Sequence, residues 1–138
     1  MSRQVYHAVA RDQASLYRLA EDRFQIIRDG ALASILTGWR YVLVSDKVFK
    51  VLREVGIPVA DRAVVVFDST TASEIRGYHE IRVNGEVTPE SISALGPAEH
   101  LWLHANRDLF MSVELYRRLA DECSDLDFSE GFSDFAAW

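Results

Sequence analysis

Apolar and polar residues alternate in several short stretches of this chain, as they do along half-buried β-strands. Such stretches, together with an apolar β-branched run at residues 62–67, predict strands at residues 4–9, 39–44, 62–67, 74–83 and 100–104. The dipeptide Asn84-Gly85 follows the fourth of these stretches and predicts a tight hairpin turn. Residues 88–95 contain a proline and are expected to form a loop or a short helix.

A different pattern runs from residue 13 to residue 28, where apolar residues recur at spacings of three and four. This spacing is typical of one face of a helix, and the residues that carry it are Leu16, Leu19, Ala20, Phe24 and Ile27. We therefore expect a helix there, ended by Gly30, although residues 23–27 could instead form a strand. Residues 31–37 are expected to add a turn of helix that ends at Gly38.

One sequence pattern occurs twice in the chain, at positions 67 residues apart. Each copy has an apolar strand, a serine that can cap a helix, and a short amphipathic helix. Ser45 and Leu52 of the first copy recur as Ser112 and Leu119 of the second. The first helix is expected to end at Gly56, and the repeat units span about 39–56 and 106–123. Their shared apolar positions are expected to fill a core.

The bulk composition is that of a single domain. The chain has 138 residues, 49% of them hydrophobic, and no linker divides it, so residues 1–138 are expected to form one α+β domain with a mixed or antiparallel sheet and short helices. No apolar run approaches the ~20 residues of a membrane span, and no signal-peptide pattern occurs, so we expect a cytoplasmic protein without membrane contact. The single cysteine, Cys123, excludes an internal disulfide and agrees with a reducing compartment.

The formal net charge is −6, and residues 121–138 hold six acidic residues and no basic one. No basic stripe is present, so nucleic acid is not an expected partner. The functional interpretation of this tail is a binding surface, in which the acidic side chains attract a basic protein partner and the aromatic side chains anchor it. The predicted partner-binding residues are Glu122, Asp125, Asp127, Phe128, Glu130, Phe132, Asp134, Phe135 and Trp138. The alternative is a terminal strand whose aromatic rings pack inward while its acids face water.

No catalytic, cofactor or metal motif stands out, so we expect no catalytic residue, cofactor or metal. His100 and His104 have a possible ligand spacing, but on a strand they would lie ~13 Å apart. Acidic neighbours are expected to raise the pKa of Cys123 and to weaken it as a nucleophile. The alternatives to a binding protein are a small enzyme whose pocket uses His79, His100, His104 and Asn106, and a homo-oligomeric structural module.

The repeated unit resembles the immunity proteins of bacterial polymorphic-toxin systems, in particular families related to the double-CxxCG immunity proteins. The resemblance is carried by residues 39–46 with the helix through Gly56, and by residues 108–113 with their helix and the segment 128–132. Both CxxC pairs of the double-CxxCG proteins are missing here, so no metal role is carried over.

This resemblance implies a small cytoplasmic α+β protein that binds a cognate toxin and blocks it by stoichiometric occlusion. It implies no enzymatic activity. The acidic tail would suit a toxin with a basic surface, because complementary charge speeds capture. The sequence leaves the oligomeric state open.

Overall fold

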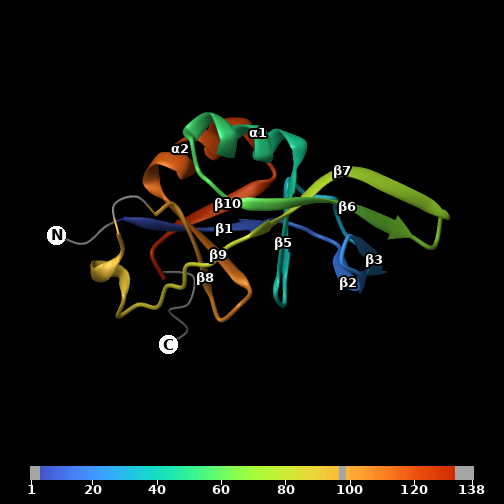
Figure 1. The fold of residues 1–138 in the computed structure, drawn as a ribbon, viewed down its shortest axis with the longest axis horizontal. Helices are drawn as coiled ribbons and strands as arrows, with labels where there is room; N and C mark the ends of the chain where they lie inside the picture. Colours follow the sequence, from blue (N-terminus) through green and yellow to red (C-terminus); the bar gives the residue numbers. More distant parts are fainter. Residues whose placement is uncertain (1–3, 97–98, 133–138) are drawn as a thin grey trace.

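Two β-sheets and a pair of short helices make up residues 4–96 and 99–132, which the structure, a computed structural model, describes. In chain order the elements are β1 (Val5–Ala10), β2 (Ser15–Ala20), β3 (Arg23–Arg28), β4 (Ile35–Gly38), β5 (Tyr41–Ser45), α1 (Asp46–Val55), β6 (Ala60–Asp68), β7 (Ser73–Arg82), η1 (Ile92–Ala94), β8 (Leu101–His104), β9 (Asp108–Ser112), α2 (Val113–Glu122) and β10 (Leu126–Glu130). The sheets have the strand orders β10-β1-β9-β8 and β2-β3-β6-β7-β5-β4. The helices lie together on one side of them (Figure 1). The protein is a single α+β domain, as predicted.

The repeated strand, serine and helix are confirmed, and the two copies have nearly the same geometry. Ser45 has φ −68° and ψ 164°, and Ser112 has φ −67° and ψ 161°, both outside the helical region. The hydroxyl of Ser45 accepts the amide hydrogen of Val48, and the hydroxyl of Ser112 accepts that of Leu115. Each serine therefore satisfies one amide that the helix leaves free, which contributes about 1 kcal/mol of stability. Only the first helix ends at a left-handed glycine, Gly56, with φ 84°.

The duplication extends beyond the part visible in the sequence. The consecutive elements β4, β5, α1 and β6 match β8, β9, α2 and β10, and every neighbouring pair in β6-β7-β5-β4 and in β10-β1-β9-β8 is antiparallel. The N-terminal strand β1 takes the place in the second unit that β7 takes in the first. The chain is thus built from two similar units, and the N-terminal strand β1 supplies the fourth strand of the second unit.

Strand register supports this correspondence. Ser45 lies opposite Tyr78 of β7, and Ser112 lies opposite Val5 of β1. The amide of each serine also donates to the carbonyl of the residue that precedes its hairpin, at 2.9 Å in both units. The two hairpin turns meet, because the amide of Arg40 donates to the carbonyl of Asn106 at 2.9 Å.

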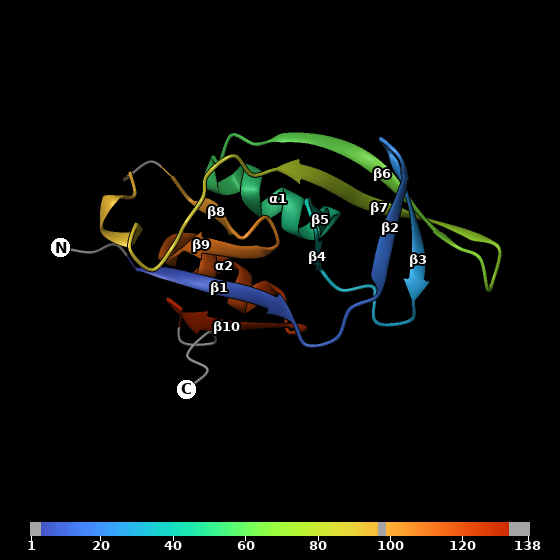
Figure 2. The same cartoon turned by 90° about the horizontal axis from the view of Figure 1, so that it is seen from below.

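The predicted helix at residues 13–28 is wrong, and the strand alternative for residues 23–27 is right. The segment forms the hairpin β2–β3, and β3 pairs in parallel with β6, with Phe24 opposite Val66. Phe24 is fully buried and Leu16 is nearly so, whereas Leu19 is half exposed. The helical spacing arose because each of the two strands, separated by a turn at residues 21–22, has one buried apolar residue and another, three positions later, that is exposed. This hairpin has no counterpart in the second unit, and it lies at the end of the molecule opposite η1 (Figure 2).

Two further local predictions are corrected. Residues 31–37 do not form a helical turn, because residues from Ile35 onward pair with β5, and residues 39 and 40 form the hairpin turn instead of starting the strand. Asn84-Gly85 does not form a hairpin turn, since the β6–β7 hairpin turns at residues 69–72. Gly85 is needed for close packing, because a Cβ atom there would lie 2.8 Å from the ring of Trp102.

The main core lies between the helices and the inner strands of both sheets. Its fully buried side chains include Leu36, Leu43, Leu52, Leu115 and Leu119. A smaller cluster forms around Trp102 and Phe110. The shared positions of the repeat, Leu52 and Leu119, therefore fill the core, as predicted. Within the described ranges, no helix has the length and apolar character required to cross a membrane.

Candidate binding cleft

The acidic residues predicted to bind a partner have different environments. Glu122 at the end of α2 and Asp127 and Glu130 on β10 are exposed, and Asp127 pairs with Arg11 at 2.9 Å. Asp125 is engaged inside the protein, where its carboxylate accepts the amide hydrogen of Ser34 at 2.7 Å and bonds the hydroxyl of Ser34 at 2.8 Å. Three of these four acids are thus exposed, and the fourth is part of the fold.

The aromatic residues of the same tail pack inward where the structure describes them. Phe128 meets the ring of Tyr116 edge-on, with centroids 5.0 Å apart, and Phe132 stacks on Phe110 at 4.5 Å. This is the arrangement of the alternative interpretation, a terminal strand with inward-facing rings. Asp134, Phe135 and Trp138 lie outside the described residues.

The residues proposed for an enzyme pocket do not come together in either of the two hollows described below. His100 bonds the hydroxyl of Ser112 through Nδ1 at 2.7 Å, and His104 bonds the carbonyl of Val87 through Nδ1 at 3.1 Å. Neither these two histidines nor His79 lines either of the two hollows described below, whereas Asn106 lines one of them. Cys123 is buried, and this burial, more than its acidic neighbours, raises the pKa of its thiol.

His79 lies between α1 and its sheet. Its ring stacks on Phe49 with centroids 4.3 Å apart, Nε2 lies 2.6 Å from Asp46, and Nδ1 lies 3.3 Å from Asp61. The matching position of the second unit holds Tyr6 stacked on Tyr116. The contacts of His79 therefore connect α1 to its sheet. Among the described residues, no group of three or more side chains is suited to bind a metal ion.

Large apolar side chains are exposed on the added hairpin β2–β3. Tyr17 is 61% exposed, Leu19 50% and Ile27 63%. Tyr17 lies opposite Gln25, so it shares a sheet face with Ile27, two residues further along β3. We call Tyr17, Leu19 and Ile27 the hairpin patch. Trp39, 62% exposed at the β4–β5 turn, lines the same hollow as Tyr17.

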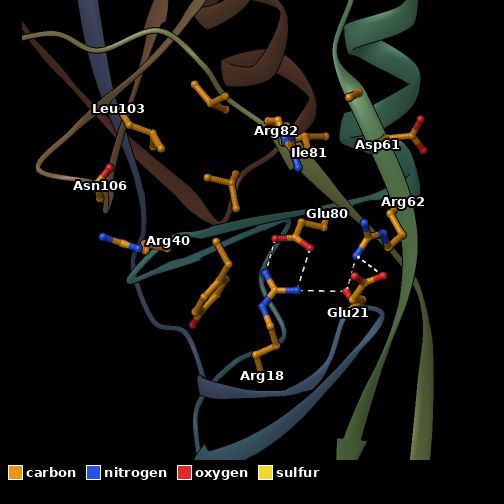
Figure 3. Close-up of a pocket in the computed structure, with 14 residues that line it drawn as sticks. Arg18, Glu21, Arg40, Asp61, Arg62, Glu80, Ile81, Arg82, Leu103 and Asn106 are labelled. Carbon is orange, nitrogen blue, oxygen red and sulfur yellow. Dashed lines mark hydrogen bonds and ion pairs between the residues drawn. The ribbon is translucent and has the colours of Figure 1, made fainter.

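Two hollows beside this patch share Arg18, Arg40 and Tyr41 in their walls, and we call them together the Arg40 cleft. The first, of about 560 Å³, lies among β2, β5, β6, β7 and the β8–β9 turn. The second, of about 810 Å³, is bordered by Tyr17, Arg28, Trp39 and Arg107. Figure 3 shows the first hollow, with Arg40 and Asn106 at one side and Arg62 and Glu21 at the other.

An ion pair crosses the first hollow. Arg18 grips the carboxylate of Glu80 with both terminal nitrogens, one of them at 3.1 Å, and this pair lies at the centre of the close-up (Figure 3). Arg18 and Arg62 also donate to the carbonyl of Glu21, at 3.0 and 2.9 Å. Bidentate pairing fixes the guanidinium plane of Arg18, so this side chain forms a wall of the cleft and is not a free cation.

Other arginines of the cleft have no such partner. In the described ranges, Arg28, Arg40 and Arg82 form no ion pair with a carboxylate, and Arg107 lies 3.9 Å from Asp108. The guanidinium of Arg40 lies 5.3 Å from the ring centroid of Trp39. Tyr41 lines both hollows, and burial raises the pKa of its hydroxyl. The cleft is therefore a cationic and aromatic surface on an acidic protein.

The sequence interpretation did not find this cleft. The predicted helix placed Tyr17 and Arg28 on one element, and Trp39 was assigned to a strand, so nothing brought the three residues together. Trp39-Arg40 directly after Gly38 was the one available signal, because a glycine followed by two further residues before a strand is compatible with a hairpin turn.

Comparison with protein-family models, with curated proteins and with solved structures gave no match to the chain.

Proposed function

We propose that this protein is a binding protein of the immunity type, which neutralises a cognate bacterial toxin by stoichiometric occlusion. The observation that carries the proposal is the hairpin β2–β3. It is absent from the second unit of the duplicated framework, and its exposed residues include Tyr17, Leu19 and Ile27. An element added to a framework and apolar on its outer face is suited to cover a partner.

The composition of this surface supports the proposal. Tryptophan, tyrosine and arginine dominate the residues that contribute most to protein–protein affinity. Here Trp39, Tyr17 and Arg40 border one cleft beside the hairpin patch. Completing the burial of a half-exposed side chain of this size gains about 1 kcal/mol, so three or four of them contribute about 3–4 kcal/mol to the free energy of binding.

The charge of the cleft specifies the surface of the partner. Arginines without carboxylates face the cleft, so the matching region of the toxin is acidic, whereas the tail alone had indicated a basic one. The exposed acids Glu122, Asp127 and Glu130 form a second candidate surface of the same function. The resemblance of residues 39–46 and 108–113 to immunity proteins supports the same class of function.

Co-expression with the product of the neighbouring reading frame tests the proposal. We expect a one-to-one complex in which the toxin is inactive. The variant with Tyr17→Ala and Ile27→Lys should lose the complex, while Leu32→Ala should keep it, because Leu32 is also apolar and 43% exposed but lies outside the hairpin β2–β3. If the hairpin variant binds as the natural protein does, the hairpin is not the interface.

A second set of variants separates the two candidate surfaces. Replacing Asp127 and Glu130 by lysine reverses the acidic edge of β10 and leaves the cleft intact. Loss of binding only in this variant would place the toxin on the tail. Sedimentation of the purified protein alone tests the homo-oligomeric alternative, because a dimer that disappears with Ile27→Lys would show that a second copy covers the hairpin patch.

A further inference from the structure

We infer that the Arg40 cleft binds carboxylate groups of an extended acidic segment. The inference deepens the proposed function, because that segment would belong to the bound partner. It concerns the cleft itself, however, and can be tested with a free peptide.

The first argument is the charge balance of the cleft. The carboxylate of Glu80 is already held by Arg18, and Glu21 is near Arg62. Arg28, Arg40 and Arg82 have no carboxylate partner within the described part of the chain. An arginine guanidinium matches a carboxylate in shape and binds it through two parallel hydrogen bonds. The unmatched groups of the cleft are therefore suited to side-chain carboxylates.

The second argument is shape. The two hollows lie on either side of Arg40 and Tyr41, and both are open to the surface. Each has the volume of a typical ligand site, but neither encloses a ligand on all sides. Two adjoining open hollows with a shared wall are suited to an extended peptide segment of the partner that crosses from one hollow to the other. Tyr17 and Trp39 border only the second, so we place an apolar side chain of the segment there, next to a carboxylate at Arg40.

The third argument is the backbone of Arg40. Its φ of 64° lies in the left-handed region, where a glycine would have no steric conflict. The amide of Arg40 is nevertheless fixed by the carbonyl of Asn106 of the other hairpin turn. Residues held in this way are concentrated at binding sites, because the surrounding structure keeps them in an unfavourable conformation. The side chain of Arg40 therefore starts from a position set by both repeat units.

Nucleic acid is the competing anionic polymer, and the charges of the molecule disfavour it. The net charge is −6, and four carboxylates line the cleft among the arginines: Glu21, Asp61, Glu80 and Asp108. A continuous row of phosphates would face these acids, whereas a peptide can place its carboxylates only at the free arginines.

Fluorescence anisotropy with the full-length protein tests the inference. The probe is a labelled peptide of alternating glutamate and glycine with one central phenylalanine, and the control peptide has glutamine in place of glutamate. We expect binding of the glutamate peptide only, weakened by added salt. Arg40→Gln should weaken it about tenfold or more, since it removes a charge-assisted pair. Arg117→Gln is the matched control, because Arg117 is exposed on α2 and does not line the cleft.

Several results would overturn the inference. One is equal binding of the glutamate peptide to the natural protein and to Arg40→Gln, with both proteins folded by circular dichroism. Another is equal binding of the glutamine peptide, or tighter binding of a single-stranded oligonucleotide than of the glutamate peptide. If the toxin is captured and the peptide is not, this inference fails and the proposed function stands. If the peptide binds as expected and no toxin is captured, the inferred site for acidic peptides stands and the proposed function fails.

Discussion

Removal of the two capping serines should have unequal effects, although their backbone conformations are almost the same. Ser45 is half-buried and makes one bond in its cap, to the amide of Val48. Ser112 is 0% exposed, and its hydroxyl both accepts the amide hydrogen of Leu115 and bonds His100 Nδ1 at 2.7 Å. Alanine removes one hydrogen bond in the first unit and two in the second.

The size of the difference follows from these contacts. Loss of a serine cap costs about 1 kcal/mol. Loss of the bond to His100, in a half-buried place, costs about 1 kcal/mol more. We therefore expect Ser45→Ala to lower the free energy of unfolding by about 1 kcal/mol and Ser112→Ala to lower it by about 2 kcal/mol. Urea denaturation measures both values, and an unchanged slope would show that both variants unfold from the same compact state.

Glycine substitutions are the matched controls. Glycine is itself tolerated as a cap and costs only a few tenths of a kcal/mol, so Ser45→Gly should be nearly neutral. Ser112→Gly still loses the bond to His100 and should remain destabilised by about 1 kcal/mol. Equal losses for the two alanine variants, or a larger loss at Ser45, would refute the reasoning, because the cap alone would then account for stability in both units.

Three further predictions concern a buried tyrosine, the added hairpin and the cleft. Burial, and then nearby Asp125, raises the pKa of Tyr78 from 10.0 to about 12. The unfolded chain therefore loses this proton first, and its loss should lower stability by about 2–3 kcal/mol between pH 10 and pH 12 in urea titrations. The fall should be smaller by this amount in Tyr78→Phe, which keeps the contribution of Tyr41. Phe24→Ala should cost about 3–5 kcal/mol, against about 0.5 kcal/mol or less for Ile27→Ala, and equal thermal shifts would contradict this. Trp39→Ala should leave the melting temperature nearly unchanged and weaken toxin binding by about 2 kcal/mol in calorimetry.

The sequence was most informative where local chemistry alone decides the structure. A serine before an amphipathic stretch and a glycine after it predicted α1 correctly, because cap residues act on their own helix. The strand at residues 62–67 was also confirmed, since β-branched and aromatic residues suit a half-buried sheet. These features require no knowledge of distant contacts.

Prediction failed where tertiary pairing decides. The spacing of Leu16, Leu19 and Phe24 fits a helix, but Phe24 is buried by its parallel pairing with β6, about forty residues later in the chain. The sequence also does not show that β1 takes the place of β7 in the second unit, because this pairing too joins residues far apart in the chain. The Arg40 cleft was missed because its wall combines β2, the β4–β5 turn and the β8–β9 turn, which only the complete fold brings together.

The positions at which the two units differ separate the framework from the surface offered to a partner. Where Ser45 and Leu52 recur as Ser112 and Leu119, the residues cap and fill both units alike. The β4–β5 turn carries Trp39 and Arg40, whereas the matching turn is one residue longer and has Asn106 and Arg107 at the corresponding places, so the arginine recurs and the tryptophan does not. The hairpin β2–β3 is present in one unit only. Phe24 explains the inner face of the added hairpin, but the core explains neither the exposed Trp39 nor the exposed Tyr17. Both side chains border the same hollow, so selection for binding is the simplest physical account of their presence together.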